Sequence, residues 1–255
     1  DGRAEPTLAA PAIARAIRRL GGKVMTRCAV RGVETAGGRV SGLVTERGPI
    51  SCNSVVLAGG AWSRLFAGNM GIDLPQLRVV NSVMRTAAIE TGLEQAAATG
   101  KFAIRKRLDG GYTIAHRHLS VADIVPDSFR LLLPFLPVLR MVSGGLRLRV
   151  GRQLVEEARM KRRWKLDERS PFEAVRVLDP EPVGSILREA FESLKDYFPA
   201  FRDAEIVERW AGLNDATPDA VPVISDVEDR PGLFIATGFS GHGFGIGPGA
   251  GCLMA

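Results

Sequence analysis

A glycine-rich segment near the end of the chain constrains the fold more than any other feature. Residues 238–251 read Gly-Phe-Ser-Gly-His-Gly-Phe-Gly-Ile-Gly-Pro-Gly-Ala-Gly, with seven glycines in fourteen positions. Glycine loses backbone entropy on folding, so proteins concentrate it where the main chain approaches a ligand or takes positive φ. An apolar run, Leu233–Ala236, precedes the segment, and we expect a helix to start near Gly247-Pro248. A flexible linker would lack both flanks, so the pattern favours a main-chain ligand loop.

The size and composition of the chain suit a globular fold. It has 255 residues, of which 45% are hydrophobic and 24% charged, enough for one large domain or two modest ones. Collagen, a coiled coil and wholesale disorder are excluded. Cys28, Cys52 and Cys252 are an odd number in a long chain, which argues against a disulfide framework and for a reducing compartment. The start, Asp1-Gly2-Arg3, has no methionine and no apolar signal, so we expect a piece of a longer protein.

The net charge of +6 is confined to one segment. Residues 140–170 contain ten Lys or Arg and four Asp or Glu, which accounts for the whole excess. Grooves that follow nucleic-acid backbones carry stacking aromatic residues, and this segment has only Trp164. We therefore expect a solvated basic face and no nucleic-acid partner.

An apolar patch precedes the basic segment. Its longest run, residues 131–139, has nine residues and two prolines, whereas a membrane-spanning helix needs about 20 apolar residues. Residues 129–165 could contact a partner subunit or a membrane surface. The alternative is a buried helix pair covered by arginine stems. The expected location is cytoplasmic, with peripheral attachment to the inner face of the membrane as the alternative.

The first seventy residues alternate between helix and strand patterns. Thr7 is placed to cap a helix with Ile13, Ile17 and Leu20 on one face, which Gly21-Gly22 ends. Strands are expected at 23–30, 39–45 and 54–58. The third strand is apolar throughout and leads through Gly59-Gly60-Ala61-Trp62-Ser63 into a helix that ends near Met70. Such a strand, small-residue turn and helix form half of a nucleotide-type α/β unit.

The pattern of predicted secondary structure changes at about residue 77. Strand-like segments at 78–86, 102–105 and 112–116 are separated by turns, which indicates an antiparallel sheet. A helix is expected at 182–197 and further strands at 204–213, 221–224 and 233–236.

Four segments together resemble the FAD-dependent amine and amino-acid oxidoreductases, the superfamily of D-amino-acid oxidase, glycine oxidase and sarcosine oxidase. They are residues 55–63 (Val-Val-Leu-Ala-Gly-Gly-Ala-Trp-Ser), 210–213 (Trp-Ala-Gly-Leu), 216–224 (Ala-Thr-Pro-Asp-Ala-Val-Pro-Val-Ile) and 232–245, which includes Gly-Phe-Ser-Gly-His-Gly-Phe-Gly. Among relatives, the sequences of these segments resemble most the branch of D-amino-acid dehydrogenase, hydroxyproline dehydrogenase and opine oxidase. The resemblance implies an α/β fold with part of a Rossmann-like FAD-binding domain at 1–76 and 212–255. Between these parts, 77–211 would form a substrate domain with an antiparallel sheet and helices.

The resemblance also implies where FAD would lie. The main chain at Val30 would contact the adenine, and Gly59, Ala61 and Trp62 would line the adenosine or pyrophosphate side. The flavin ring and ribityl chain would be wrapped by Gly238, Ser240, Gly241, His242, Gly243, Phe244 and Gly245. Donors at a helix start would stabilise negative charge on the reduced ring. His242 would add a hydrogen bond, or serve as a spacer whose backbone matters more than its ring.

Two departures from the family pattern limit these implications. The amino-terminal βαβ unit with GxGxxG, which holds the pyrophosphate, is absent, so we expect this chain alone to bind FAD weakly or not at all. Relatives similar to glycine oxidase carry a carboxylate-binding arginine after Trp-Ala-Gly-Leu, where this chain has Asn214. Phe102 corresponds to an assisting tyrosine in those relatives. Tyr112 and His116 are further candidates for the mouth of the substrate site, with core or surface packing as the alternative for Tyr112, as is usual for an aromatic residue in a strand.

The implied reaction is oxidation of a C–N bond in an amino acid, N-substituted amino acid, imino acid or opine, followed by hydrolysis of the imine. Oxygen and a quinone are both open as electron acceptor. No catalytic acid or base is assigned, and no metal is expected, because the pair His116 and His118 has no third ligand. The alternative is a non-catalytic remnant or a partner-binding fragment of such an enzyme.

Overall fold

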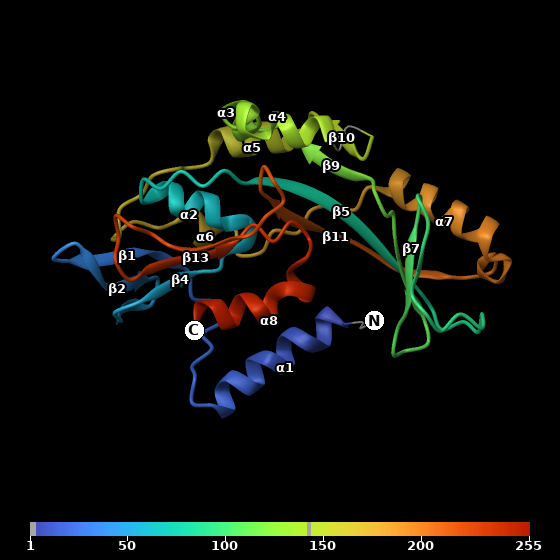
Figure 1. The fold of residues 1–255 in the computed structure, drawn as a ribbon, viewed down its shortest axis with the longest axis horizontal. Coiled ribbons are helices and arrows are strands. Elements are labelled where there is room, and N and C mark those ends of the chain that lie inside the picture. The colour runs from blue at the N-terminus through green and yellow to red at the C-terminus, as the bar shows by residue number, and fades with distance from the viewer. Residues whose placement is uncertain (1–3, 142–143) are drawn as a thin grey trace.

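The computed structural model describes residues 4–141 and 144–255 (Figure 1). Within these ranges the strands form one seven-stranded sheet and two three-stranded sheets. The α/β fold expected from the sequence is confirmed, and Figure 1 shows the first helix, α1, and the last, α8, on the same side of the long sheet.

The chain begins with a helix and a small antiparallel sheet. Helix α1 spans Pro6–Arg19, and strands β1 (Val30–Ala36), β2 (Arg39–Thr45) and β3 (Gly48–Ser51) pair in order. Two details of the sequence prediction are wrong. Thr7 lies inside α1, since a proline at the first helical position leaves Glu5 as the N-cap. The strand predicted at 23–30 begins only at Val30, where pairing with β2 starts.

The second small sheet joins the two ends of the chain. Strand β4 (Val55–Leu57) pairs in parallel with β13 (Leu233–Thr237), which pairs antiparallel with β12 (Val223–Asp226). After β4 come the 3₁₀ turn η1 (Gly60–Trp62) and helix α2 (Ser63–Asn69), as predicted. We call residues 59–62 the Trp62 turn. Leu57, Phe66, Ala67 and Ile235 form the buried core between sheet and helix.

The large sheet is almost entirely antiparallel, as predicted; only its β9–β10 pair is parallel. Its central strand is β5, which pairs with β11 along nearly its whole length and with β8 and β9 on its other edge. The strand bounds are β5 Leu77–Thr86, β6 Ala97–Ala98, β7 Ala103–Lys106, β8 Tyr112–Ala115, β9 Ser120–Asp123, β10 Leu146–Arg149 and β11 Ile206–Ala216.

Helix α7 (Gly184–Tyr197) covers one face of this sheet and ends at the 3₁₀ turn η2 (Pro199–Phe201). Its buried residues, Ile186, Leu187, Ala190 and Leu194, are those that the periodicity predicts. A layer of short helices, seen at the top of Figure 1, lies beyond β9. It contains α3 (Pro126–Arg130), α4 (Leu132–Met141) and α5 (Arg152–Arg159).

The chain then returns toward the first sheet through α6 (Pro171–Ala174). Trp164 Nε1 donates to the carbonyl of Arg31 on β1 at 2.7 Å, and Glu173 accepts two hydrogen bonds from the Arg31 guanidinium. Residues 164–173 therefore pack on the amino-terminal part of the fold, although they lie inside the predicted substrate range 77–211. The last element, α8, spans Gly243–Met254.

Candidate cofactor site

The glycine loop, residues 238–245, has a backbone that requires glycine at two positions. Gly238 has φ +76° and Gly241 has φ +87°, in the left-handed region. A Cβ at Gly238 would lie 2.5 Å from Thr217 Cγ2, and one at Gly241 would lie 2.9 Å from Asn214 Nδ2. The loop is thus a tight main-chain structure packed against the end of β11.

Helix α8 begins inside this loop, four residues earlier than predicted. The N–H groups of Gly245 and Ile246 both donate to the carbonyl of His242, which starts the helix at Gly243 and leaves Pro248 in its interior. The first N–H groups of a helix have no intrahelical acceptor and carry partial positive charge. The glycine loop therefore presents donors suited to an anion or to a ring oxygen that gains negative charge.

A buried hydrogen-bond network, centred on Asp215 at the end of β11, joins the glycine loop to the Trp62 turn. Asp215 Oδ2 accepts from the Gly238 N–H at 2.7 Å and from the Thr237 hydroxyl at 3.0 Å. The Gln76 amide donates to both Asp215 Oδ2 (3.3 Å) and the Thr237 hydroxyl (3.1 Å). The Thr237 hydroxyl also lies 3.3 Å from the Gly60 carbonyl oxygen. Because Thr237 and Gln76 are almost fully buried, this Asp215 network fixes the two segments rigidly together.

The network would have been hard to find from the sequence. Gln76 and Asp215 are polar residues at strand ends, 139 positions apart, and neither lies in a recognisable motif. Only the pairing of β5 with β11 brings Asp215 level with the start of β5.

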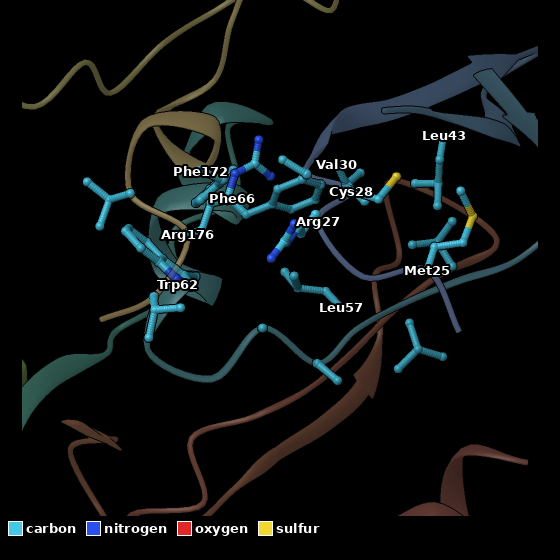
Figure 2. Close-up of a pocket in the computed structure, with 17 residues that line it drawn as sticks. Met25, Arg27, Cys28, Val30, Leu43, Leu57, Trp62, Phe66, Phe172 and Arg176 are labelled. Carbon is cyan, nitrogen blue, oxygen red and sulfur yellow. The ribbon is translucent and has the colours of Figure 1, made fainter. Parts of the chain in front are cut away.

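On the other side of the Trp62 turn lies a mostly apolar pocket of about 610 Å³ (Figure 2). It brings together three of the predicted cofactor residues, Val30, Gly59 and Trp62. Ala61 does not line it; this residue lines a separate small cavity with Arg78, which donates a hydrogen bond to its carbonyl. The pocket has the size and character of a small-molecule site.

One wall of this pocket was missed by the sequence analysis. Phe172 of α6 packs edge-on against Trp62 and Trp164, with ring centres 5.2 and 5.4 Å away. Figure 2 shows Arg27 and Arg176 from two segments beside the same pocket. Arg176 is fixed by Glu46, whose carboxylate accepts two hydrogen bonds of 2.7 Å. These hydrogen bonds lower the pKa of Glu46 to about 2.

The face of the large sheet that looks toward the glycine loop is opposite α7. Ala211 and Leu213 pack on the α7 side, so the alternating positions Trp210, Gly212 and Asn214 face the loop. The contact between Asn214 and Gly241 agrees with this assignment. Asn214 therefore lies beside the glycine loop, and its role in binding substrate stays a prediction.

Two predicted substrate residues, Phe102 and Tyr112, are wrong. Both are fully buried in the core cluster with Leu187, Leu194 and Phe201. The Tyr112 hydroxyl donates to the Leu93 carbonyl at 2.7 Å and lies 2.6 Å from the Thr91 hydroxyl. Because side chains alternate along a strand, both residues point toward α7 and away from the glycine loop.

His116 is also on the α7 side, and its predicted place at the mouth of the site is wrong. Its side chain is 4% exposed, and Nδ1 accepts hydrogen bonds from the N–H groups of His118 and Leu119. Nε2 lies 3.9 Å from Glu189 of α7 and has no hydrogen-bond partner among the described residues. Burial is the largest influence and lowers the pKa of His116. In the described ranges no group of three or more His, Cys, Asp or Glu is arranged to hold a metal.

The residues present fit FAD. The apolar pocket beside Val30 and Trp62 suits an adenosine group. Glycine at 238 and 241 lets the loop pack directly on Thr217 and Asn214, which holds its backbone in place. The start of α8 supplies donors for the ring. The Asp215 network links these two parts.

Comparison with known proteins supports the same assignment. The chain is similar to L-amino acid deaminase from Proteus myxofaciens, solved with anthranilate, with 40% identity and a TM-score of 0.89 over 94% of this chain and 54% of that one. The chain is also similar to L-amino acid deaminase from Proteus vulgaris, with 34% identity and a TM-score of 0.92 over 98% of this chain and 58% of that one. 4-Methylaminobutanoate oxidase (formaldehyde-forming) from Paenarthrobacter nicotinovorans is 26% identical over 257 residues, covering 100% of this chain and 26% of that protein.

The chain thus spans about a quarter to a little over half the length of these three proteins. Glycine oxidase, sarcosine oxidase and D-amino acid dehydrogenase are among the other matches, which confirms the resemblance stated from the sequence. The model of the family described as FAD dependent oxidoreductase matches residues 1–255. The chain belongs to this family of FAD-dependent oxidoreductases.

Proposed function

We propose that this chain forms the flavin- and substrate-facing part of an enzyme that oxidises the C–N bond of an amino acid. The observation that carries the proposal is the Asp215 network, which holds the glycine loop against the Trp62 turn and opposite Trp210 and Asn214. FAD, when bound, accepts the hydride from the carbon next to nitrogen. Water then hydrolyses the resulting imine to an oxo acid and an amine.

The roles of the chain's own residues follow from their positions. The main-chain N–H groups of Gly243 and Phe244 at the start of α8 would stabilise negative charge on the reduced ring, with α8 adding its dipole. Ser240, His242 and Phe244 would shape the loop around the ring. The pocket at Val30, Gly59 and Trp62 would hold the adenosine half, and Ala61 would contribute through its backbone.

The similarity to L-amino acid deaminases supports a primary amino acid as substrate. N-substituted amino acids, imino acids and opines are the other members of the proposed class. Asn214 stands where glycine oxidase-like relatives carry arginine, so a different group would bind the carboxylate. Oxygen and a quinone are both candidates for reoxidising the flavin.

We further propose that tight FAD binding needs an additional α/β unit. Among the described strands, β4 pairs with β13 alone, which leaves its other edge unpaired. Large apolar side chains are also exposed on three elements. They lie in or directly after α1 (Leu8, Ile13, Ile17, Leu20), in β4 (Val56) and in α8 (Phe244, Ile246, Leu253). Such an edge and such faces suit a βαβ unit that supplies the phosphate-binding turn.

Anaerobic bleaching of the flavin tests the proposed function. The protein that contains this chain, expressed at its full length, is loaded with FAD and mixed with L- and D-amino acids, N-methyl amino acids, hydroxyproline and opines. Loss of the yellow absorbance with at least one of these, together with an oxo product, is the expected result. A protein that binds FAD but is bleached by none of them contradicts the proposed reaction and favours a non-catalytic role.

The isolated chain provides a second test. We expect it to purify without stoichiometric flavin, because its 255 residues contain no GxGxxG turn to hold the pyrophosphate. A yellow isolated chain at one FAD per molecule contradicts the need for the additional unit.

The α3–α4 surface supports a separate proposal, contact with a membrane surface. Phe129, Leu132 and Leu133 are 67%, 49% and 81% exposed beside basic residues of the same segment. No helix in the described ranges is long and apolar enough to cross a bilayer. Co-sedimentation with anionic vesicles that falls in the double variant Leu132→Ser, Leu133→Ser supports it. No binding at low salt contradicts it and leaves a partner subunit as the other occupant.

A further inference from the structure

Arg78, at the start of β5, contacts the Trp62 turn in two ways. Its Nε donates a 2.9 Å hydrogen bond to the Ala61 carbonyl, and its guanidinium carbon lies 5.0 Å from the centre of the Trp62 ring. The side chain is only 20% exposed, so both interactions are weakly screened by water. One side chain thus holds the backbone and the ring of the turn.

Glu157, on the surface helix α5, holds Arg78 from the other side. Its Oε1 accepts a 3.2 Å hydrogen bond from Arg78 Nη1, and its side chain is 14% exposed. Burial raises the pKa of Glu157, while attraction by Arg78 opposes this rise. A cavity of about 30 Å³ beside the pair has room for about one water molecule. The pair therefore sits in a tight polar space between α5 and the turn.

A second contact joins the same layer to the other end of the turn. Arg64, two residues after Trp62, donates from Nε to Asp127 of α3 at 2.9 Å. Asp127 also accepts hydrogen bonds from Arg162 and Arg130. The backbone N–H of Arg64 donates to Gln76 of the Asp215 network at 3.1 Å. The α3–α5 layer is therefore linked by charged hydrogen bonds to the segments on both sides of Trp62.

We propose that Arg78 is a positioning residue for the Trp62 turn and that Glu157 fixes Arg78 in its working geometry. A guanidinium is suited to this role because one planar group can donate to a carbonyl, pair with a carboxylate and lie over an indole. A lysine ammonium is a compact charge that cannot keep all three contacts. The importance of this turn for FAD rests on the proposed function, but the positioning of Trp62 does not.

The test is spectroscopic and uses the whole chain. Arg78→Lys, Arg78→Met and Glu157→Gln are compared with Arg149→Met. The Arg149 control removes two hydrogen bonds to Asp123, of 2.6 and 2.9 Å, in the neighbouring strands β9 and β10. The signal of Trp62 is the difference between each protein and its Trp62→Phe derivative, in near-ultraviolet circular dichroism and in acrylamide quenching.

We expect Arg78→Met to lose most of the Trp62 dichroism and to increase its quenching severalfold. Arg78→Lys should fall between this variant and the parent, and Glu157→Gln should shift the signal in the same direction by less. Arg149→Met should leave it unchanged. The proposal is overturned if the Trp62 dichroism and quenching are unchanged in both Arg78→Lys and Glu157→Gln. It is also overturned if Arg149→Met changes these signals as much as the Arg78 variants do. The conservative variants keep the test decisive if Arg78→Met fails to fold.

A double-mutant cycle gives an independent measure. The effect of Arg78→Lys on the unfolding equilibrium constant should be about three- to tenfold smaller in a Trp62→Leu background, because that background has no aromatic ring for the guanidinium to contact. Additive effects contradict the contact. FAD titration of the longer protein separates this proposal from the proposed function. If the longer protein does not bind FAD, the proposed function is contradicted, but the Trp62 signals still test the role of Arg78.

Discussion

Helices α1 and α7 have the same length and similar amphipathic patterns, but the fold treats them differently. Each has fourteen residues. Helix α7 buries Ile186, Leu187, Ala190 and Leu194 against the large sheet, whereas none of the residues of α1 is buried in the described structure. Leu20, which closes the apolar stripe of α1, is 88% exposed. A periodic stripe thus specifies a helix and a face, but not the partner of that face.

The difference also separates a part of the molecule whose apolar side chains are buried from a part whose apolar side chains are exposed. The α7 core encloses Phe102 and Tyr112 with no exposed surface. The exposed faces of α1 and α8 and the unpaired edge of β4 are where the proposed additional α/β unit would bind. The following predictions test whether the two parts differ in energy as they do in burial.

The largest effect is expected from truncation in the α7 core. Leu194→Ala removes a fully buried side chain and should lower the free energy of unfolding by about 2–5 kcal/mol. Leu20→Ala should change it by less than about 0.5 kcal/mol. Denaturant titration of both variants measures the contrast. Equal losses would show that α1 is packed in solution and would contradict the comparison.

Acid should act next most strongly, through Asp127. Burial would raise the pKa of this carboxyl, but hydrogen bonds from Arg162, Arg64 and Arg130 lower it to about 2. Its folded pKa is below the unfolded value, so its contribution is present above about pH 4 and is lost as the pH falls toward 2, amounting to about 2 kcal/mol. Denaturant titrations of the parent across this pH range should show that the free energy of unfolding falls as the pH is lowered.

The slope of this fall should become smaller in Asp127→Asn, where carboxyls such as Glu46 still contribute, and should be unchanged in Asp73→Asn. Asp73 also pairs with Arg64, at 3.0 Å, but its side chain is 82% exposed. Identical pH profiles for Asp127→Asn and the parent would contradict the role of the buried carboxylate.

Two glycines of the same loop extend the comparison to the candidate site. Gly241→Ala places a side chain at positive φ against Asn214, which should destabilise the chain by about 1–2 kcal/mol. A Cβ at Gly245 would meet no described atom within 4 Å, and Gly245→Ala should stabilise α8 by up to about 1 kcal/mol. Thermal unfolding measures both changes. In the longer protein, only Gly241→Ala should weaken FAD binding; equal effects would contradict the close approach of the loop.

The smallest change in stability is expected from charge on the α1 face. Ile17→Lys places a charge at a position that is 43% exposed, so the free energy of unfolding of this chain should change by about 0.5 kcal/mol or less. In the longer protein the same change should reduce flavin content, because it disrupts the proposed contact with the additional unit. Unchanged flavin content would place that unit elsewhere.

Much of the fold could be predicted because local signals agreed with it. Strand 39–45, the turn at Gly37-Gly38, the strand–turn–helix around Trp62 and the buried residues of α7 all follow from periodicity and turn chemistry. The errors arose where the local signal was ambiguous. Phe102 and Tyr112 were placed in the substrate site because a strand pattern does not reveal which face meets which neighbour.

The sequence alone determined the chemistry of the backbone in the glycine loop and the family to which the chain belongs. Seven glycines after an apolar strand have few other uses, since each can adopt positive φ or admit a close neighbour without a clash. The tertiary structure decided which residues meet: Asp215 with Gln76, Arg78 with Trp62, and Phe172 with the pocket. Trp62 lies 16 positions from Arg78 and 110 from Phe172, and Gln76 lies 139 from Asp215. Only the pairing of strands and the return of the chain bring these residues together.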